Sequence, residues 1–109
     1  MANNKVIQGF KGFDKDFKCR DFQFEEGKTY TEDKAVICNK GFHFCENPLD
    51  VFGYYPPGEN RFASVEGSGK TAGHSDDSKV ACTEIHIKSE LTISAFIQAC
   101  TKFVFDRVD

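Results

Sequence analysis

The hydrophobic and polar residues of this chain alternate mainly with the two-residue period of β-strands. The segment 79–88 shows the period best: one face carries Ala81, Thr83, Ile85 and Ile87, and the other carries Cys82, Glu84 and His86. Shorter segments of strand character cover 5–10, 22–24, 28–30, 35–38, 41–45 and 61–66. Glu26-Gly27 predicts a hairpin between 22–24 and 28–30. Residues 11–20 and the Gly- and Ser-rich segment 67–78 are predicted loops.

Two segments have helical signals instead. Asn47 is a good N-cap and Pro48 a good first helical residue, so a short helix is expected over 48–55, before Pro56-Pro57-Gly58. Thr92 or Ser94 can cap a second helix that runs to about 107, with Ile93, Phe96, Ile97, Cys100 and Val104 as its apolar stripe. The pattern predicts one α+β domain over 1–109: a small antiparallel or mixed sheet with a short central helix and a C-terminal helix.

Composition narrows the classes of protein that remain. Twelve phenylalanines among 109 residues, against two leucines, favour a sheet-rich core over a helix bundle. Hydrophobic residues at 39% exclude wholesale disorder, and a net charge of -3 argues against a basic nucleic-acid-binding surface. We find no long apolar run and no export signal. Together with an odd number of cysteines, five, this predicts a reducing cytosol and a protein that does not enter a membrane.

The candidate metal ligands gather around a predicted turn. His43 and Cys45 are two apart on a predicted strand and so share a face, and Cys38 precedes the turn that folds back toward them. Cys19 could complete a tetrahedral Cys3His shell for zinc. The alternative is a set of buried thiols and a hydrogen-bonded core histidine. Cys82 and Cys100 are interpreted as core thiols.

Acidic residues are concentrated in two places. The first is the stretch with Asp14, Asp16, Asp21, Glu25 and Glu26, and the second is the pair Asp76 and Asp77. Such charge usually forms a solvated face, but it also fits a surface that meets a basic groove of another protein. Glu66–Thr71 resembles the end of a phosphate-binding loop but lacks its first glycine and the helix that should follow.

An enzymatic alternative rests on the segment 41–55. Its strand, short helix and Tyr54-Tyr55 pair resemble the unit that frames the nicotinamide pocket of ADP-ribosyltransferase-like folds. Glu66 or Glu84 could supply the glutamate that such a transferase needs, but no early histidine or arginine partner stands out. The two tyrosines could equally pack the helix onto the sheet.

Several sequence blocks carry a resemblance that spans about residues 8–92. They are Lys11-Gly-Phe-Asp, Phe17-Lys-Cys-Arg-Asp-Phe-Gln-Phe, Gly27-Lys-Thr-Tyr, Asp77-Ser-Lys-Val-Ala and, most specifically, Gly41-Phe-His-Phe-Cys-Glu-Asn-Pro-Leu-Asp-Val-Phe-Gly-Tyr-Tyr. With these blocks the chain resembles a small domain of phages and prophages, and within that group the zinc-binding type II-A anti-CRISPR proteins.

The resemblance implies a function that composition does not. It implies a non-enzymatic inhibitor that binds the type II CRISPR effector nuclease in the bacterial host cytosol and blocks target DNA loading or cleavage. We further expect a monomer that does not itself contact nucleic acid. It also implies a structural zinc ion held by Cys19, Cys38, His43 and Cys45. No family motif marks the contact surface, so the acidic residues named above are our candidates for it.

Overall fold

The computed structural model describes residues 5–32, 41–73 and 77–108, and it is built mainly of antiparallel strands. Its elements, in chain order, are β1 (Ile7–Phe13), β2 (Lys18–Cys19), β3 (Phe22–Gln23), β4 (Thr29–Thr31), β5 (Phe42–Cys45), α1 (Pro48–Val51), β6 (Arg61–Gly73), β7 (Lys79–Leu91) and α2 (Ile93–Asp106). The predicted α+β class, an antiparallel sheet with two helices, is confirmed.

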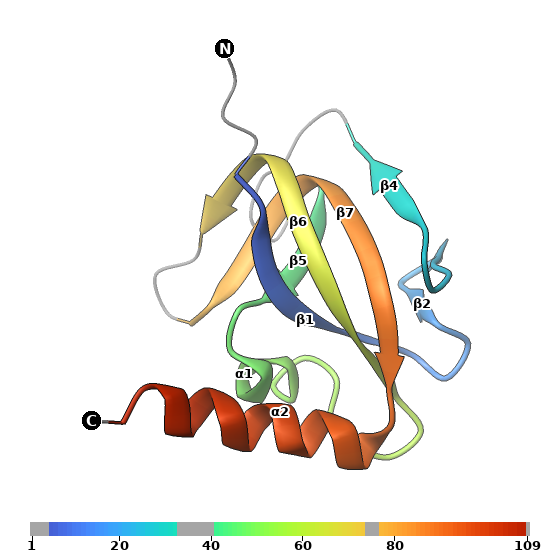
Figure 1. Cartoon of the computed structure of the whole chain (residues 1–109). Helices are drawn as coiled ribbons and strands as arrows, with labels where there is room; N and C mark the ends of the chain where they lie inside the picture. The colour runs from blue at the N-terminus through green and yellow to red at the C-terminus, as the bar shows by residue number, and fades with distance from the viewer. Residues whose placement is uncertain (1–4, 33–40, 74–76, 109) are drawn as a thin grey trace.

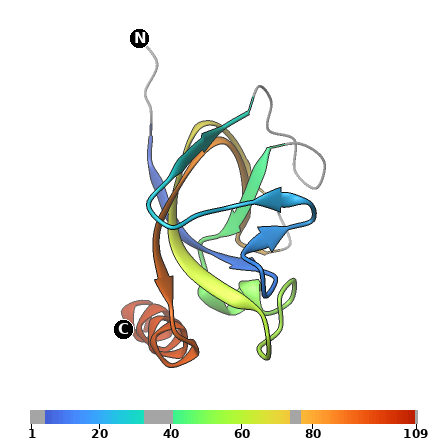
Figure 2. The ribbon, with the colours of Figure 1, turned by 90° about the vertical axis from the view of Figure 1, so that its right-hand side faces the viewer.

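Four of the strands close into a small barrel. β6 pairs with β7 along most of its length and with β1 on its other edge, while β5 pairs with both β7 and β1. β4 continues the edge of β7 beyond β5, where Tyr30 lies opposite Ile85. Figures 1 and 2 show the curved β6 and β7 wrapping around the centre, with α2 below the barrel. β2 and β3 form a separate two-stranded ribbon beside it.

The barrel interior is a cluster of aromatic and β-branched side chains, which we call the barrel cluster. Its buried members are Phe13, Phe17, Phe24, Phe42, Phe44, Ala63, Val65, Val80, Cys82, Ile85 and Ile87. Two glycines make room for it, because a Cβ on Gly9 or Gly67 would run into the Phe44 ring. The many phenylalanines therefore fill a closed sheet, as the composition indicated.

A second apolar cluster, the helix cluster, lies between the barrel and the two helices. It contains Cys45, Val51, Phe62, Phe96 and Cys100, and the Phe62 and Phe96 rings stack with centroids 4.5 Å apart. The Asn47 side chain caps α1 by accepting from the Leu49 amide, and Thr92 caps α2 by accepting from the Ala95 amide. Both caps are as predicted, and Cys82 and Cys100 are buried as expected of core thiols.

Several predicted local details are wrong. The segment 67–73 is not a loop: it continues β6, because pairing with β7 compensates for its small residues. Gly69 adopts a φ of +78° at the irregularity between Ser68 and Thr71, a conformation that favours glycine. The glycines thus mark a bulged strand, and the part of the predicted loop at 74–76 lies outside the described residues.

The N-terminal half also differs from the prediction. β3 pairs with β2, and β4 pairs with β7, so 22–24 and 28–30 do not form a hairpin. Residues 11–13 belong to β1, since they pair with β6. The helix predicted over 48–55 ends at Val51, and turns follow it. The strand predicted at 35–38 lies outside the described residues.

Candidate functional site

A cleft of about 310 Å³ is lined by residues of β5, the β2–β3 ribbon and the segment 51–55, and three of the four predicted metal ligands line it. We call it the cysteine cleft. Its lining includes Lys11, Gly12, Cys19, Arg20, Asp21, Phe22, Glu32, His43, Cys45, Tyr54, Tyr55 and Lys79. All four residues of β5 line the cleft: His43 and Cys45, and also Phe42 and Phe44, whose rings belong to the barrel cluster. The structure therefore brings His43 and Cys45 to one cleft next to the barrel cluster.

One wall of the cleft contains a buried cation. Lys11 is only 7% exposed, and its Nζ donates to the backbone oxygen of His43 at 2.6 Å. The same Nζ lies 5.3 Å from the centre of the Phe24 ring and 5.8 Å from that of Phe13. These contacts compensate for burying the charge and fix β1 against β5 next to His43.

Cys19 also lines the cleft, and hydrogen bonds hold its side chain in place. Its Sγ donates to the backbone oxygen of Gly12 at 3.2 Å, and it also hydrogen-bonds with the Tyr55 hydroxyl. Burial, and then this bond to Cys19, raise the pKa of Tyr55 above its ordinary value. A Cβ on Gly12 would lie 2.6 Å from the Cβ of Tyr55, so the close approach of the two segments needs glycine here.

Cys45 is the buried cysteine of the cleft, with 3% of its surface exposed. Burial raises the pKa of its thiol to about 12, with smaller contributions from the carboxylates of Asp77 and Asp50. The thiol is therefore protonated at neutral pH unless a metal or another cation compensates for the charge.

A zinc ion requires its four ligand atoms to converge on one point. Zinc needs ligand atoms about 2.0 to 2.3 Å from one point. In the described part of the chain, no three His, Cys, Asp or Glu side chains come together closely enough to hold a metal ion. Cys38 lies outside the described residues. The structure thus brings Cys19, His43 and Cys45 to one cleft, where a metal would have to replace the Cys19 bond to Gly12.

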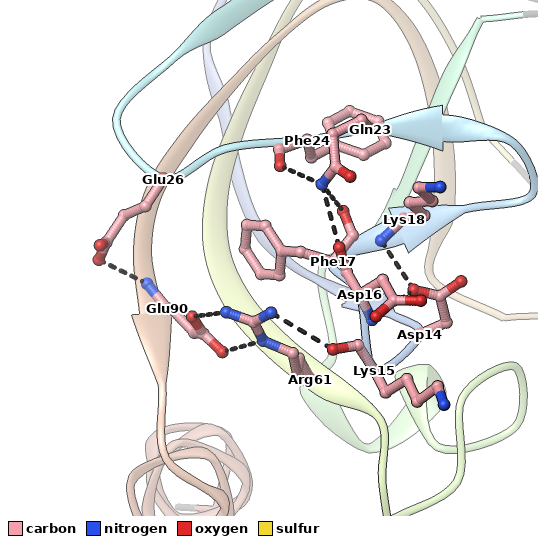
Figure 3. Close-up of polar contacts among 10 residues, drawn as sticks. All are labelled: Asp14, Lys15, Asp16, Phe17, Lys18, Gln23, Phe24, Glu26, Arg61 and Glu90. Carbon is pink, nitrogen blue, oxygen red and sulfur yellow. Dashed lines mark hydrogen bonds and ion pairs between the residues drawn. The ribbon is translucent and has the colours of Figure 1, made fainter.

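The acidic candidates of 14–26 lie on the β2–β3 ribbon and the segments that flank it, which together we call the acidic loop; Figure 3 shows three of them, Asp14, Asp16 and Glu26. Two of the acids hold the loop in place. Asp14 Oδ1 accepts from the amides of Asp16 and Lys18, both at 2.9 Å, and Glu26 accepts from the Glu90 amide at 2.9 Å. The side chains of Asp16, Asp21 and Glu25 are exposed. The loop therefore has acids with internal bonds and acids that face solvent.

Residues that the sequence did not single out stabilise the acidic loop. Gln23 Nε2 donates to the backbone oxygens of Asp16, Phe17 and Phe24. Arg61 makes two 2.7 Å bonds to Glu90, and its guanidinium lies 4.6 Å from the centre of the Phe17 ring (Figure 3). The role of Asp14 has a sequence signal, because an aspartate whose side chain accepts from amides a few residues further on is typical of a turn. No local sequence pattern indicates that Gln23 or Arg61 stabilises the loop.

The second acidic focus lies elsewhere. Asp77 accepts from the Tyr54 hydroxyl at 2.6 Å and from the Lys79 amide at 2.8 Å, so it helps hold the rim of the cysteine cleft. Asp76 lies outside the described residues.

The residues proposed for a transferase do not meet at the cleft. Glu66 accepts from Gln8 and pairs with Lys88 at 3.7 Å, and these partners lower the pKa of its carboxyl. Neither Glu66 nor Glu84 lines the cysteine cleft, whereas Tyr54 and Tyr55 do. The glutamates that the enzymatic alternative requires are thus separated from its aromatic residues.

Comparison with known proteins gives one match. A family model described as "Domain of unknown function (DUF7666)" matches residues 7–99, which include β1 to β7 and the first half of α2. No curated protein and no solved structure matches. Among the described residues, no helix is long and apolar enough to cross a membrane.

Proposed function

The chain belongs to the DUF7666 family, and from that premise we propose that it acts by binding, without catalysis, as an inhibitor of a type II CRISPR effector nuclease. The identity of the nuclease rests on the resemblance described for the sequence blocks. The mode of action rests on the acidic loop. Its exposed acids are presented by a backbone that is already fixed before any partner arrives.

The observation that supports binding is the conformation of this loop. Phe17 and Arg20 have φ angles of +63° and +57°, which side chains other than glycine rarely adopt. Such a conformation costs of order 1–3 kcal/mol per residue and persists only where surrounding contacts enforce it. Here Asp14, Gln23 and the Phe17 ring under Arg61 enforce it. A fixed loop loses little conformational entropy on binding.

The exposed carboxylates of the loop outnumber its exposed cations, Lys15 and Arg20, and this acidic excess fits the proposed partner. CRISPR nucleases carry positively charged channels for guide and target. Exposed carboxylates at Asp16, Asp21 and Glu25 would be attracted there, and the exposed Phe22 between them offers apolar contact area. An inhibitor seated in such a channel blocks the loading of target DNA.

The test uses the exposed acids only. Reversing all five candidates would also break the internal bonds of Asp14 and Glu26, so the informative variant combines Asp16→Lys, Asp21→Lys and Glu25→Lys. The matched control combines Glu46→Lys, Glu59→Lys and Glu84→Lys, which are exposed acids elsewhere. Binding to the nuclease is measured at low and high salt. We expect the loop variant to bind at least tenfold more weakly at low salt, with a smaller difference at high salt. Equal affinity of both variants would refute the role of the loop.

A titration separates binding from catalysis. A binder inhibits only when it approaches one molecule per nuclease, whereas an enzyme inhibits at a small fraction of that ratio. Inhibition at low ratio that requires NAD would favour the transferase alternative and overturn the binding proposal.

We also propose that Cys19, Cys38, His43 and Cys45 hold one structural zinc ion. Three of these residues line one cleft, which supports the set, and such an ion would join the acidic loop to β5. Four protein ligands leave no position for substrate, and the binding free energy of the metal adds to folding. Elemental analysis should find about one zinc per chain. Cys38→Ser or Cys45→Ser should lose it and lower the melting temperature, while Cys82→Ser should keep it. If protein that has been prepared without chelator contains no zinc, the proposal is wrong.

A further inference from the structure

α2 has an apolar face that the described part of the chain leaves uncovered. One side of the helix packs Phe96 and Cys100 against the barrel. The neighbouring side exposes Ile93, Ile97 and Val104, and Phe105 and Val108 follow at the end, with Phe105 71% exposed. Between this face and α1 lies a groove of about 360 Å³, lined by Leu49, Phe52, Ile97, Cys100, Thr101, Val104 and Phe105.

The exposed apolar area is large for a domain of this size. Six residues, Leu49, Ile93, Ile97, Val104, Phe105 and Val108, are each between 44% and 71% exposed. At areas of roughly 150 to 200 Å² per complete residue, they present roughly 500 Å² of apolar surface, at the upper range for a monomer. Two copies would bury about 1,000 Å² together, the lower bound for a specific interface.

The order of the residues along the helix indicates what covers this face. The positions of Ile93, Ile97, Val104 and Val108 are mirror-symmetric about a point between Cys100 and Thr101. An antiparallel second copy would therefore place Ile97 against Val104 and Ile93 against Val108, twice over. Thr101, a small exposed residue near the centre, allows close approach of the two helices. This self-complementarity is the requirement of a two-fold symmetric interface.

Charge does not oppose this pairing. From Ile93 to Val104, α2 carries a single charged side chain, Lys102, and this forms an ion pair with Asp106 at 3.0 Å on the same helix. No run of like charges would meet across an antiparallel pair. We propose that the chain forms a homodimer through antiparallel packing of α2 on α2 of a second copy, with the α1–α2 groove as part of the interface.

This dimer is independent of the proposed function, because α2 and the acidic loop are different surfaces. It replaces the monomer expected in the sequence analysis. A dimer would present two acidic loops to its partners.

Sedimentation velocity over about 1 µM to 1 mM protein tests the proposal, since interfaces of this size dissociate in that range. We expect a concentration-dependent shift from monomer to dimer. Ile97→Lys and Val104→Asp should each move the midpoint to at least tenfold higher concentration. The matched control Thr71→Lys adds the same charge at an exposed position of β6, outside α2 and the groove, and should leave the midpoint unchanged.

The double variant Ile97→Lys with Val104→Asp tests the orientation. In the antiparallel arrangement each new ammonium faces a new carboxylate of the other copy, so the double variant should dimerise more strongly than either single variant. A parallel pair would show no such recovery. A wild-type chain that stays monomeric throughout the range overturns the proposal. So does an Ile97→Lys variant that weakens nuclease binding without changing self-association, because the face would then belong to that partner.

Discussion

The barrel cluster and the helix cluster are both rich in phenylalanine, but they are enclosed to very different degrees. Strands surround the barrel cluster on all sides, and Phe13, Val65, Ile85 and Ile87 have no exposed surface. The helix cluster is covered by α1 and α2, and neighbouring residues of α2, such as Ile97, are about half exposed. The barrel cluster is thus the better enclosed of the two, whereas the helix layer leaves apolar surface exposed.

The largest contrast should appear when one phenylalanine is truncated in each region. Phe13→Ala removes a fully buried ring that stacks on Phe17 at 4.1 Å, so we expect a loss of about 3–5 kcal/mol in unfolding free energy. Phe105→Ala removes a ring that is 71% exposed and should change stability by less than about 0.5 kcal/mol. Urea denaturation at low protein concentration measures both without a contribution from self-association. Equal losses would mean that the two regions are equally enclosed.

A glycine pair tests how tightly the barrel is packed. A Cβ at Gly67 would collide with the Phe44 ring, so Gly67→Ala should cost about 1–3 kcal/mol through overpacking. At Gly73, in the same strand, a Cβ meets nothing within 4 Å, and Gly73→Ala should change stability by less than about 0.5 kcal/mol. Thermal unfolding of the two variants side by side gives the comparison. A barrel that tolerates Gly67→Ala would have to be more deformable than its packing indicates.

The attachment of α2 depends on its first turn. Thr92 Oγ1 accepts from the Ala95 amide at 3.1 Å, and Thr92→Ala should cost about 1 kcal/mol. The control is Ser94→Ala, because Ser94 lies two residues after Thr92 and does not form the cap. Hydrogen exchange should show faster exchange of the amides at the start of α2 in the Thr92 variant, with the barrel amides unchanged. Faster exchange throughout the barrel would show that the two regions unfold as one unit.

The smallest expected effect concerns the ion pair between Arg61 and Glu90. This pair joins the start of β6 to the end of β7, near α2. The Arg61 hydrogen bonds lower the pKa of the Glu90 carboxyl below its ordinary value. The contribution of the ion pair to folding stability is therefore complete at pH values above the ordinary glutamate pKa of about 4.5. It is lost as the pH falls through the lowered pKa of Glu90. Both side chains are about one third exposed, so the contribution should be less than about 1 kcal/mol.

Glu90→Gln provides the measurement for this pair. The variant should be slightly less stable at neutral pH, and its stability should fall less steeply than that of the wild type below pH 4.5. Glu66, whose pKa is also lowered, titrates in the same range and keeps part of the slope in both proteins. An identical pH slope in the two proteins would contradict the role assigned to Glu90.

The sequence by itself determined the features that depend on neighbouring residues. Asn47 and Thr92 identified the helix starts because a capping side chain bonds an amide two or three residues away. Alternation located β7, and the turn signal before Gly41 located β5. His43 and Cys45, singled out together in the sequence, both line the cysteine cleft. The excess of phenylalanine over leucine indicated a sheet-rich core. None of these inferences needs to know which strands pair.

Tertiary structure alone decided the pairing and the extent of the strands. β4 pairs with β7, more than fifty residues away, because it continues the β7 edge beyond β5 and packs Tyr30 against Phe24 and Phe42 of the barrel cluster. The local sequence pattern predicts a loop at Gly67 and Gly69, but both lie in β6. Gly67 makes room for the Phe44 ring, and Gly69 adopts the positive φ of a bulge. The bonds from Gln23 and the Arg61–Glu90 pair fix the acidic loop through contacts that no local pattern contains. Short-range hydrogen bonds and periodicity can be derived from sequence, whereas long-range packing becomes visible only once the chain has closed on itself.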